Sequence, residues 1–326
     1  MPGIATRQTS WLLAAAIAAA MTAPAHAEFP DRTVKIVVPF EAGGTVDTVA
    51  RALAERLKVK WQVPVIVENR PGAGNIMGAT AVAQAAPDGY TLLLANTSIS
   101  VNPSLYKTLP YDTKRDLAPV VFLAPSPNVL LVQKKLGVDS VKDLIALAKS
   151  RAGRPLTFAS VGKGSFHHFS MELFKLEAGV DLLHVPYKGV ASAMLAFIRG
   201  DIDLYCSDLP GALPGIRSGD LKPLAVTGAT RVATLTDVPT MREAGLPNYA
   251  AVGYVGIMTT GGAPPAVINT INAAINEVIR EDEFNRRFSA LGYQMTGGSA
   301  EEFASFLERD IARYAALMTS LGGPIE

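Results

Sequence analysis

The sequence has 326 residues, 49% of them hydrophobic, and its 30 basic and 29 acidic residues give a formal charge of +1. A chain of this length can bury one or two ordinary cores. Its near-neutral charge offers no field that would attract a polyanion, so nucleic acid is not an expected partner.

The first 27 residues have the pattern of a secretory signal peptide. Arg7 provides a basic leader, residues 11–23 are apolar, and the triplet AHA at 25–27 places small residues where cleavage occurs. The thirteen apolar residues are too few to cross a bilayer, since a spanning helix takes about 20. We therefore expect export to the periplasm, with cleavage near Ala27.

From Val34 on, strand-like and helix-like segments alternate, which is typical of a parallel sheet with helices on its faces. The pattern predicts strand 34–40, helix 45–60, strand 63–70, helix 75–86 and strand 90–96. A β-type run at 118–133 is too long for one ordinary strand and is broken by Pro125 and Pro127. We expect this run to carry the chain from one domain to another.

The alternation then resumes and predicts a second α/β unit. Its expected elements are helix 141–151, strand 156–162, helix 165–178, strand 182–189, helix 190–198, strand 202–208, helix 213–218 and strand 222–228. A second long β-type run at 249–261 precedes helices 265–280, 282–291 and 300–321, which we expect to return to the first domain.

Two such crossovers predict an α/β fold of two lobes joined by a hinge, with a cleft between them where ligands commonly bind. We expect lobe 1 to contain residues 28–125 and 250–326, and lobe 2 to contain residues 126–249.

The stretch VVPFEAGGTVDTVAR, residues 37–51, joins a predicted strand to a predicted helix. Gly43 and Gly44 allow the backbone to approach a ligand closely, and Thr45 can begin the helix. A helix start carries about half a positive charge, so this loop suits an anion. It matches neither the dinucleotide nor the phosphate-loop fingerprint. A plain turn, and a purely helix-stabilising role for Asp47, stay open as alternatives.

The stretch ASVGKGSFHHF, residues 159–169, repeats this arrangement in the second unit, with Ser165 at the helix start. Two helix starts that face each other across a cleft would hold one carboxylate. Asn96, Thr97, Ser98 and Asp208 follow predicted strands, at the edge where open α/β sheets bind ligands. They are candidates for contacts to the rest of the ligand.

Metal and catalytic chemistry find little support. His167 and His168 are neighbours on a helix and point about 100° apart, with no matched cysteine or carboxylate, so no metal site is expected. His168 is a candidate pocket residue, and His184 is most simply a strand residue with a satisfied ring. No GxSxG elbow surrounds Ser165. We expect the single cysteine, Cys206, to be a small buried hydrophobic residue. A single cysteine cannot form an internal disulfide.

Several motifs occur together and in a familiar order: VVPFEAGGTVDTVAR, VENRPGAGN, APDGYTLLLAN, LPYD, GKGSFHHFSMELF, HVPYKG and PTMREAGLP. Through them the whole mature chain resembles the periplasmic solute receptors of tripartite tricarboxylate transporters, the Bug or TctC-like family. The resemblance implies a type II-like periplasmic-binding-protein fold, a "Venus flytrap" with two crossover strands.

The resemblance also implies how a ligand is held. A carboxylate would lie between the loops at 40–47 and 160–168, bound by backbone amides near Gly43, Gly44 and Thr45 and by the amide and hydroxyl of Ser165. The candidate binding residues are Phe40, Gly43, Gly44, Thr45, Asp47, Asn96, Thr97, Ser98, Ser160, Gly162, Gly164, Ser165, His168 and Asp208.

The chain departs from the family pattern at a few positions. Glu41 stands where proline is frequent, Phe166 and His167 stand where small residues are frequent, and Tyr254, Val255 and Gly256 replace a Trp-Tyr-Gly run. Glu41 adds negative charge and Phe166 adds bulk near the expected anion site, so both bear on which ligand fits.

The sequence thus predicts a monomeric, non-enzymatic receptor that needs no cofactor. It would bind a small organic carboxylate, such as a di- or tricarboxylate or an aromatic acid, and deliver it to integral membrane transporter subunits. Two alternatives stay open: a sensor that presents the bound carboxylate to a signalling partner, and an exported hydrolase that uses Ser165.

Overall fold

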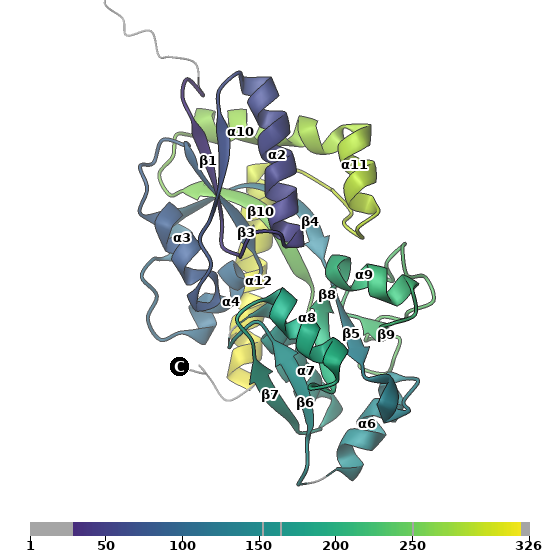
Figure 1. Ribbon diagram of the computed structural model, residues 1–326. Coiled ribbons are helices and arrows are strands. Elements are labelled where there is room, and N and C mark those ends of the chain that lie inside the picture. Colours follow the sequence, from purple (N-terminus) through teal and green to yellow (C-terminus); the bar gives the residue numbers. More distant parts are fainter. Residues whose placement is uncertain (1–28, 152, 164, 250, 321–326) are drawn as a thin grey trace, which may run out of the picture. The chain divides into compact units, whose positions relative to one another are not determined.

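Two five-stranded sheets form the framework of the protein (Figure 1). The computed structural model describes residues 29–151, 153–163, 165–249 and 251–320. The helices and strands described below all lie in one compact unit, Arg32–Glu326. The expected signal peptide lies outside the described residues, as does Gly164.

The first sheet has the strand order β2-β1-β3-β10-β4. β1 pairs in parallel with β2 and β3, whereas β10 runs antiparallel between β3 and β4. The strands are β1 (Val34–Val38), β2 (Val65–Asn69), β3 (Thr91–Asn96), β4 (Leu117–Ser126) and β10 (Gly253–Thr260).

The second sheet repeats this pattern with the order β7-β6-β8-β5-β9. β6 pairs in parallel with β7 and β8, and β5 runs antiparallel between β8 and β9. The strands are β5 (Asn128–Val132), β6 (Leu156–Ser160), β7 (Leu182–Pro186), β8 (Leu204–Asp208) and β9 (Lys222–Val226).

The chain passes between the sheets in the same way in both directions. It leaves the edge strand β4, turns at Pro127 and enters the second sheet as β5. Proline has no N–H to donate to a ladder, so it ends one strand and allows the next to join another sheet. The chain later leaves the edge strand β9 and returns as β10. We call the elements around the first sheet lobe 1 and those around the second lobe 2.

The prediction of a two-lobed α/β fold with two crossovers is confirmed. The residue boundaries proposed for the lobes stay a prediction, and Ala250 lies outside the described residues.

Helices surround both sheets. Those of lobe 1 are α2 (Thr45–Trp61), the 3-10 helix η1 (Ala73–Asn75), α3 (Ile76–Ala83), α4 (Ser98–Leu105), α5 (Thr113–Asp116), α10 (Pro265–Arg280), α11 (Asp282–Ser289) and α12 (Ala300–Ser320). Those of lobe 2 are the 3-10 helix η2 (Lys134–Leu136), α6 (Val141–Ser150), α7 (Phe166–Ala178), α8 (Val190–Arg199) and α9 (Leu209–Arg217).

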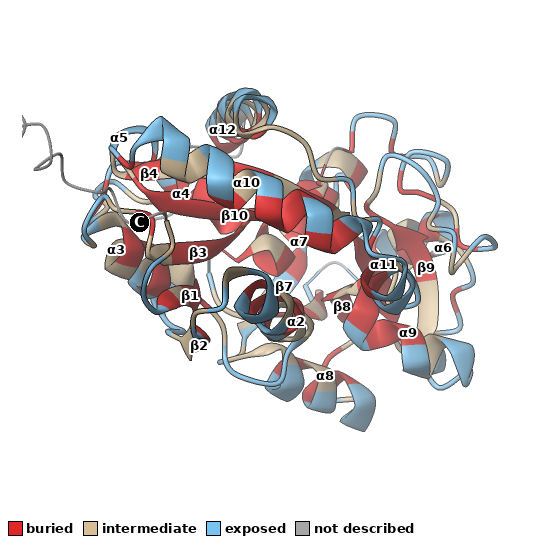
Figure 2. Ribbon diagram, turned by 90° about the horizontal axis from the view of Figure 1, so that it is seen from above, coloured by how far each residue is buried: buried red, intermediate tan, exposed pale blue. Residues whose placement is uncertain are grey.

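Local sequence signals explain where several helices begin. Ser140 caps α6, and Pro265 opens α10 at the first-turn position that proline tolerates. Ser299 and Glu302 form the expected capping box before α12, since the amide of each residue donates to the side chain of the other. Figure 2 shows the result for α10, whose outer stripe is exposed while its inner stripe is buried.

Three helices differ clearly from the sequence-based expectation, and one of them is the short, unpredicted α5. α9 begins at Leu209 instead of residue 213, because Pro210 is accepted in the first turn of a helix. α4 was not predicted, since its serine-rich sequence with Pro103 is a poor helix former. Burial of Ile99, Val101 and Leu105 stabilises it.

One hydrophobic cluster joins the lobes. It contains Val101 of α4 and Tyr314 and Met318 of α12 together with residues of lobe 2. The Tyr314 ring meets the edge of Phe169 in α7, with 4.6 Å between the ring centroids. The C-terminal helix thus returns to lobe 1, as expected, and also contacts lobe 2. None of the helices in the described part of the chain combines the length and the apolar character that a membrane span needs.

Candidate functional site

A cavity of about 860 Å³ lies where helix starts of both lobes come together. Its wall includes Thr45 of α2 in lobe 1, and Phe166, Val190 and Gly211 of α7, α8 and α9 in lobe 2. In a parallel β-α arrangement the helices begin at the edge of the sheet where the strands end. Each helix start carries a partial positive charge, so the cavity favours an anion.

Most of the predicted site residues come together here. The predicted residues that line the cavity are Phe40, Gly43, Gly44, Thr45, Asn96, Thr97, Ser98, Gly162, Ser165 and Asp208. Asp47, Ser160 and His168 are buried and do not line it. Gly164 lies outside the described residues.

Asp47 holds the loop that precedes α2 in its shape. Its Oδ2 accepts hydrogen bonds from the Gly43 N–H at 2.9 Å and from Arg51 Nε at 2.9 Å. Its Oδ1 accepts from Asn69 Nδ2 at 2.8 Å, and the same amide group donates to the Phe40 carbonyl at 3.0 Å. The Gly43 N–H, which we expected to face the ligand, is therefore already used inside the protein.

The charge of Asp47 is stabilised by these contacts. Burial by itself would raise the pKa of the Asp47 carboxyl, but the hydrogen bonds from Arg51, Gly43 and Asn69 outweigh it and hold the pKa below its ordinary value. Asp47 is thus a buried anion that supports the loop from the side away from the cavity.

The start of α2 is open on the cavity side. Its N-cap is Gly44, which has no side chain to cap the first-turn N–H groups. The Gly44 carbonyl accepts from the Thr48 N–H, which closes the first turn. Among the described residues, the N–H groups of Thr45 and Val46 have no hydrogen-bond partner, and both residues line the cavity.

The start of α7 is arranged differently, because Ser165 caps it. The Ser165 N–H and hydroxyl both donate to the Gly162 carbonyl, at 3.3 and 2.7 Å, and Oγ accepts from the His168 N–H at 3.3 Å. Both Ser165 donors that the resemblance assigned to the ligand are thus used locally. The next two N–H groups, of Phe166 and His167, have no partner in the described part of the chain.

Both lobes therefore offer the first two N–H groups of a helix to the same cavity. We call the N–H groups of Thr45, Val46, Phe166 and His167 the amide seat. All four residues line the cavity, and hydrogen bonds from such groups to an anion are stronger than those between neutral partners.

The buried Ser160 of β6 and His168 of α7 form a cluster with the half-buried His184 of β7. Ser160 Oγ lies 2.6 Å from His184 Nε2, and the His184 and His168 rings stack with 4.1 Å between centroids. Burial lowers the pKa of His168 to about 3 and that of His184 to about 4, and Lys163 and Lys175 act in the same direction. The rings are thus neutral structural groups, and His184 has the satisfied ring that its strand position predicts.

The polar residues that follow β3 bind mainly to one another and to the backbone. The Ser98 N–H donates to Asn96 Oδ1 at 2.8 Å, and Asn75 Nδ2 donates to Ser98 Oγ at 3.0 Å. Thr97 Oγ1 accepts from the Tyr254 N–H at 3.0 Å, which ties α4 to β10. This wall is rigid and keeps hydroxyl and amide groups at the cavity surface.

The sequence-based candidate of the adjacent histidine pair is His168, but the structure places the other histidine in the cavity wall. His167 lines the cavity, whereas His168 packs against Phe158 and His184. Ser165 as an N-cap residue could have indicated this difference. An N-cap side chain accepts a hydrogen bond from the N–H of the third helical residue, here His168, and leaves the N–H groups of the first two, Phe166 and His167, without a partner.

Charged side chains surround the mouth of the cavity. Lys163 and Lys188 of lobe 2 line it and are exposed. Glu41 of lobe 1 is exposed too, and its Oε2 lies 3.1 Å from the position that a Cβ on Gly189 would take. Gly189 is the N-cap of α8 and has no side chain, so the Glu41 carboxylate approaches another open helix start.

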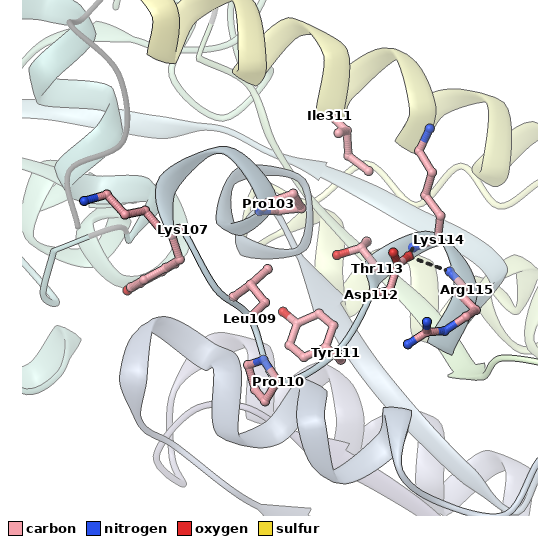
Figure 3. Close-up of a pocket in the computed structure, with 11 residues that line it drawn as sticks. Pro103, Lys107, Leu109, Pro110, Tyr111, Asp112, Thr113, Lys114, Arg115 and Ile311 are labelled. Carbon is pink, nitrogen blue, oxygen red and sulfur yellow. Dashed lines mark hydrogen bonds between the residues drawn. The ribbon is translucent and has the colours of Figure 1, made fainter.

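A second hollow of about 530 Å³ lies between α4, α5, α12 and the loop at 106–112 (Figure 3). Two of its charged side chains already have local partners: Asp112 Oδ1 accepts from the Lys114 and Arg115 N–H groups, both at 2.9 Å, and Arg115 pairs with Asp116. The hollow lacks the convergence of helix starts, so the larger cavity is the candidate site.

Other chemistry finds no support in the structure. In the residues that the structure describes, no group of three or more His, Cys, Asp or Glu side chains is placed to hold a metal ion. Cys206 is buried as predicted, and burial raises the pKa of its thiol to about 12, which keeps it protonated. The Ser165 hydroxyl donates to a carbonyl oxygen, which cannot act as its base.

Comparison with known proteins decides the family. The model of the tripartite tricarboxylate transporter family receptor matches residues 49–322. The chain belongs to this receptor family. It is 35% identical to Protein BugT of Bordetella pertussis over 311 residues, which cover 94% of this chain and 95% of BugT.

Solved structures of similar receptors share the fold. R. palustris Rpa4515 with adipate has 34% identity and a TM-score of 0.85, over 91% of this receptor and 99% of that chain. The periplasmic binding protein BugD has 32% identity and a TM-score of 0.83, over 90% and 99%. MatC from Rhodopseudomonas palustris with bound malate has 30% identity and a TM-score of 0.80, over 88% and 99%.

Replacing Asp47 by Asn tests the support of the first loop. We expect Asp47→Asn to lower the free energy of unfolding by about 1–3 kcal/mol at neutral pH, because an amide NH₂ would face the donors that now bind the carboxylate. The folded-state pKa of Asp47 is lowered, so its stabilisation is present above about pH 4 and is lost as the pH falls through the lowered pKa. Urea unfolding of both proteins between about pH 7 and pH 3 should show the gap closing on acidification.

The exposed Asp237 provides the matched control, since Asp237→Asn removes a carboxylate that faces solvent. A gap between wild type and Asp47→Asn that stays constant down to the lowest pH would show that the charge of Asp47 does not support the loop.

The stacked His168 and His184 predict a second pH effect. The folded-state pKa values of His168 and His184 lie below the ordinary value near 6.5, although Glu172 Oε1 lies 3.7 Å from His168 Nε2. The unfolded chain therefore binds more protons, and stability falls as the pH drops below about 6.5. His168→Phe keeps the stacked ring and removes one titrating group. Denaturant unfolding should show a smaller loss of stability on acidification in this variant, and equal losses in both proteins would contradict the assignment.

Proposed function

We propose that this protein is an extracytoplasmic receptor that holds the carboxylate of a small organic acid at the amide seat. One observation carries the proposal: two helix starts from different lobes present unpaired N–H groups to one cavity. Such groups bind an anion without any cationic side chain.

The strength of the amide seat is adequate for a receptor. Each hydrogen bond to a charged group contributes about 1.5–3 kcal/mol. Four of them, after the cost of ordering the ligand, are compatible with a micromolar dissociation constant, which corresponds to about 8 kcal/mol. Closure of the lobes would follow from contacts that the ligand makes in the closed state only.

Relatives support the ligand class. Rpa4515 and MatC bind adipate and malate, both of which are small dicarboxylates. We extend the carboxylate part of this chemistry to the present protein, whose cavity of about 860 Å³ is within the usual size of small-molecule sites.

The remaining parts of the proposal follow from the family and from the sequence. The protein is exported with cleavage near Ala27, acts as a monomer and delivers its ligand to integral membrane subunits. It performs no catalysis, in keeping with a Ser165 hydroxyl that donates to a backbone carbonyl instead of a base.

Removing one N–H of the amide seat tests the proposal. Proline is tolerated at the first position of a helix, and Gly44 before it has the extended conformation that proline requires (φ −75°, ψ 170°). Thr45→Pro should therefore fold normally and bind carboxylates about 10- to 100-fold more weakly, the loss expected for one charge-assisted hydrogen bond. Isothermal titration with adipate and malate measures the change.

Thr45→Ala is the matched control, because it removes the same side chain and keeps the N–H. The uncharged diamides of both acids serve as control ligands, and thermal shift provides a second readout, since a ligand of the native state raises the melting temperature. Equal carboxylate affinities of the proline and alanine variants would exclude the seat, and binding of the diamides as tightly as the acids would exclude anion recognition.

A further inference from the structure

Asp208 places a carboxyl group in the wall of the same cavity, at the end of β8 and the start of α9. Its side chain is 26% exposed and makes no capping hydrogen bond to α9. Within the described part of the chain, the one side chain recorded as a possible ion-pair partner of its carboxylate is His167, whose Nε2 lies 3.3 Å from Oδ1.

His167 is the unsatisfied group of this wall in the part of the chain that the structure describes. Its side chain is buried, and its ring stacks on Tyr205 with 5.7 Å between centroids. The contact with Asp208 lacks the geometry of a hydrogen bond, so neither ring nitrogen has a partner among the described residues. A partly exposed carboxylate and a buried ring whose two nitrogens lack hydrogen-bond partners within the described ranges thus lie side by side in the cavity wall.

Closing the lobes over a ligand removes water from this wall. A carboxylate that loses water without gaining a donor is strongly unfavourable, and a second carboxylate placed beside it is worse. The mouth lysines do not change this, because Lys163 and Lys188 are exposed and their charges are screened by solvent and salt.

We infer that Asp208 and His167 form a second recognition point, which binds a hydrogen-bond donor carried by the ligand. The inference rests on the proposed function, since the ligand's carboxylate has to occupy the amide seat at the same time. The ligand class is then a carboxylate that also bears an ammonium or hydroxyl group, in preference to a plain dicarboxylate. Asp208 accepts from that group, and His167 contributes its remaining donor or acceptor nitrogen.

Matched acids test the inference. The probes are straight-chain carboxylates of equal length that end in an ammonium, a hydroxyl, a methyl or a second carboxylate, such as 6-aminohexanoate, 6-hydroxyhexanoate, hexanoate and adipate, with shorter homologues to match the span of the cavity. Titration of the full mature protein should give affinities for the ammonium or hydroxyl acid at least about tenfold higher than for the other two.

Two variants assign the preference to this wall. Asp208→Asn should lower the affinity for the donor-bearing acid about tenfold and raise that for adipate. His167→Phe keeps a ring on Tyr205 and removes both nitrogens, so it should reduce the same preference without favouring adipate. Asp181→Asn makes the same chemical change as Asp208→Asn at a side chain of lobe 2 that is 83% exposed and outside the cavity, and it should leave the ranking unchanged.

The outcomes separate the two proposals. If carboxylates bind but adipate is preferred in the wild type, or if both cavity variants keep the wild-type ranking, the inference is wrong and the amide seat stands. If no acid of any length binds, the proposed function fails and the inference with it. If Asp208→Asn does not fold, the affinity ranking of His167→Phe tests the inference instead. The affinities for the ammonium and hydroxyl acids then show which donor this wall binds.

Discussion

The first N–H groups of a helix cannot be paired within that helix, and this constraint organises the whole cavity. Both sheets have the same strand order, so in each lobe the helices begin at the edge where parallel strands end. The two chain crossings bring these edges to one cavity. Gly44 leaves the start of α2 uncapped, whereas Ser165 satisfies only one N–H of α7. The proposed anion recognition would thus be a consequence of topology together with two cap residues.

Internal hydrogen bonds decide which donors remain for a ligand. Asp47 takes the Gly43 N–H and Gly162 takes both donors of Ser165, so the loops are held rigid before any ligand arrives. Preorganised donors lose little entropy on binding. The acidic side chains Asp208 and Glu41 would then limit which other groups a ligand can carry besides its carboxylate. A general anion site and a selective wall are therefore separable parts of one cavity, built from backbone and side chains respectively.

Much of the fold follows from local sequence, and the site follows only in part. Periodicity and glycine or proline breaks predicted the α2 helix to within one residue, and a crossing between the two units within the run at 118–133. Helix α4 was missed because packing of Val101 and Leu105 overrides its poor propensity. The glycine loop and Ser165 indicated the seat, but no spacing rule shows that Asp47 folds back on Gly43. The choice between His167 and His168 depends on which face of α7 packs against β6, which is a tertiary contact.

The amide seat can be observed directly by NMR. The backbone N–H signals of the ¹⁵N-labelled receptor are recorded while a carboxylate that the receptor binds is added stepwise. A hydrogen bond to a charged oxygen is short and strong, so we predict downfield proton shifts at Thr45, Val46, Phe166 and His167 together, with the Gly43 and Ser165 signals changing far less because those N–H groups stay bound to Asp47 and Gly162. Saturating binding that leaves the four seat signals in place, or that moves those of one lobe only, would contradict the account.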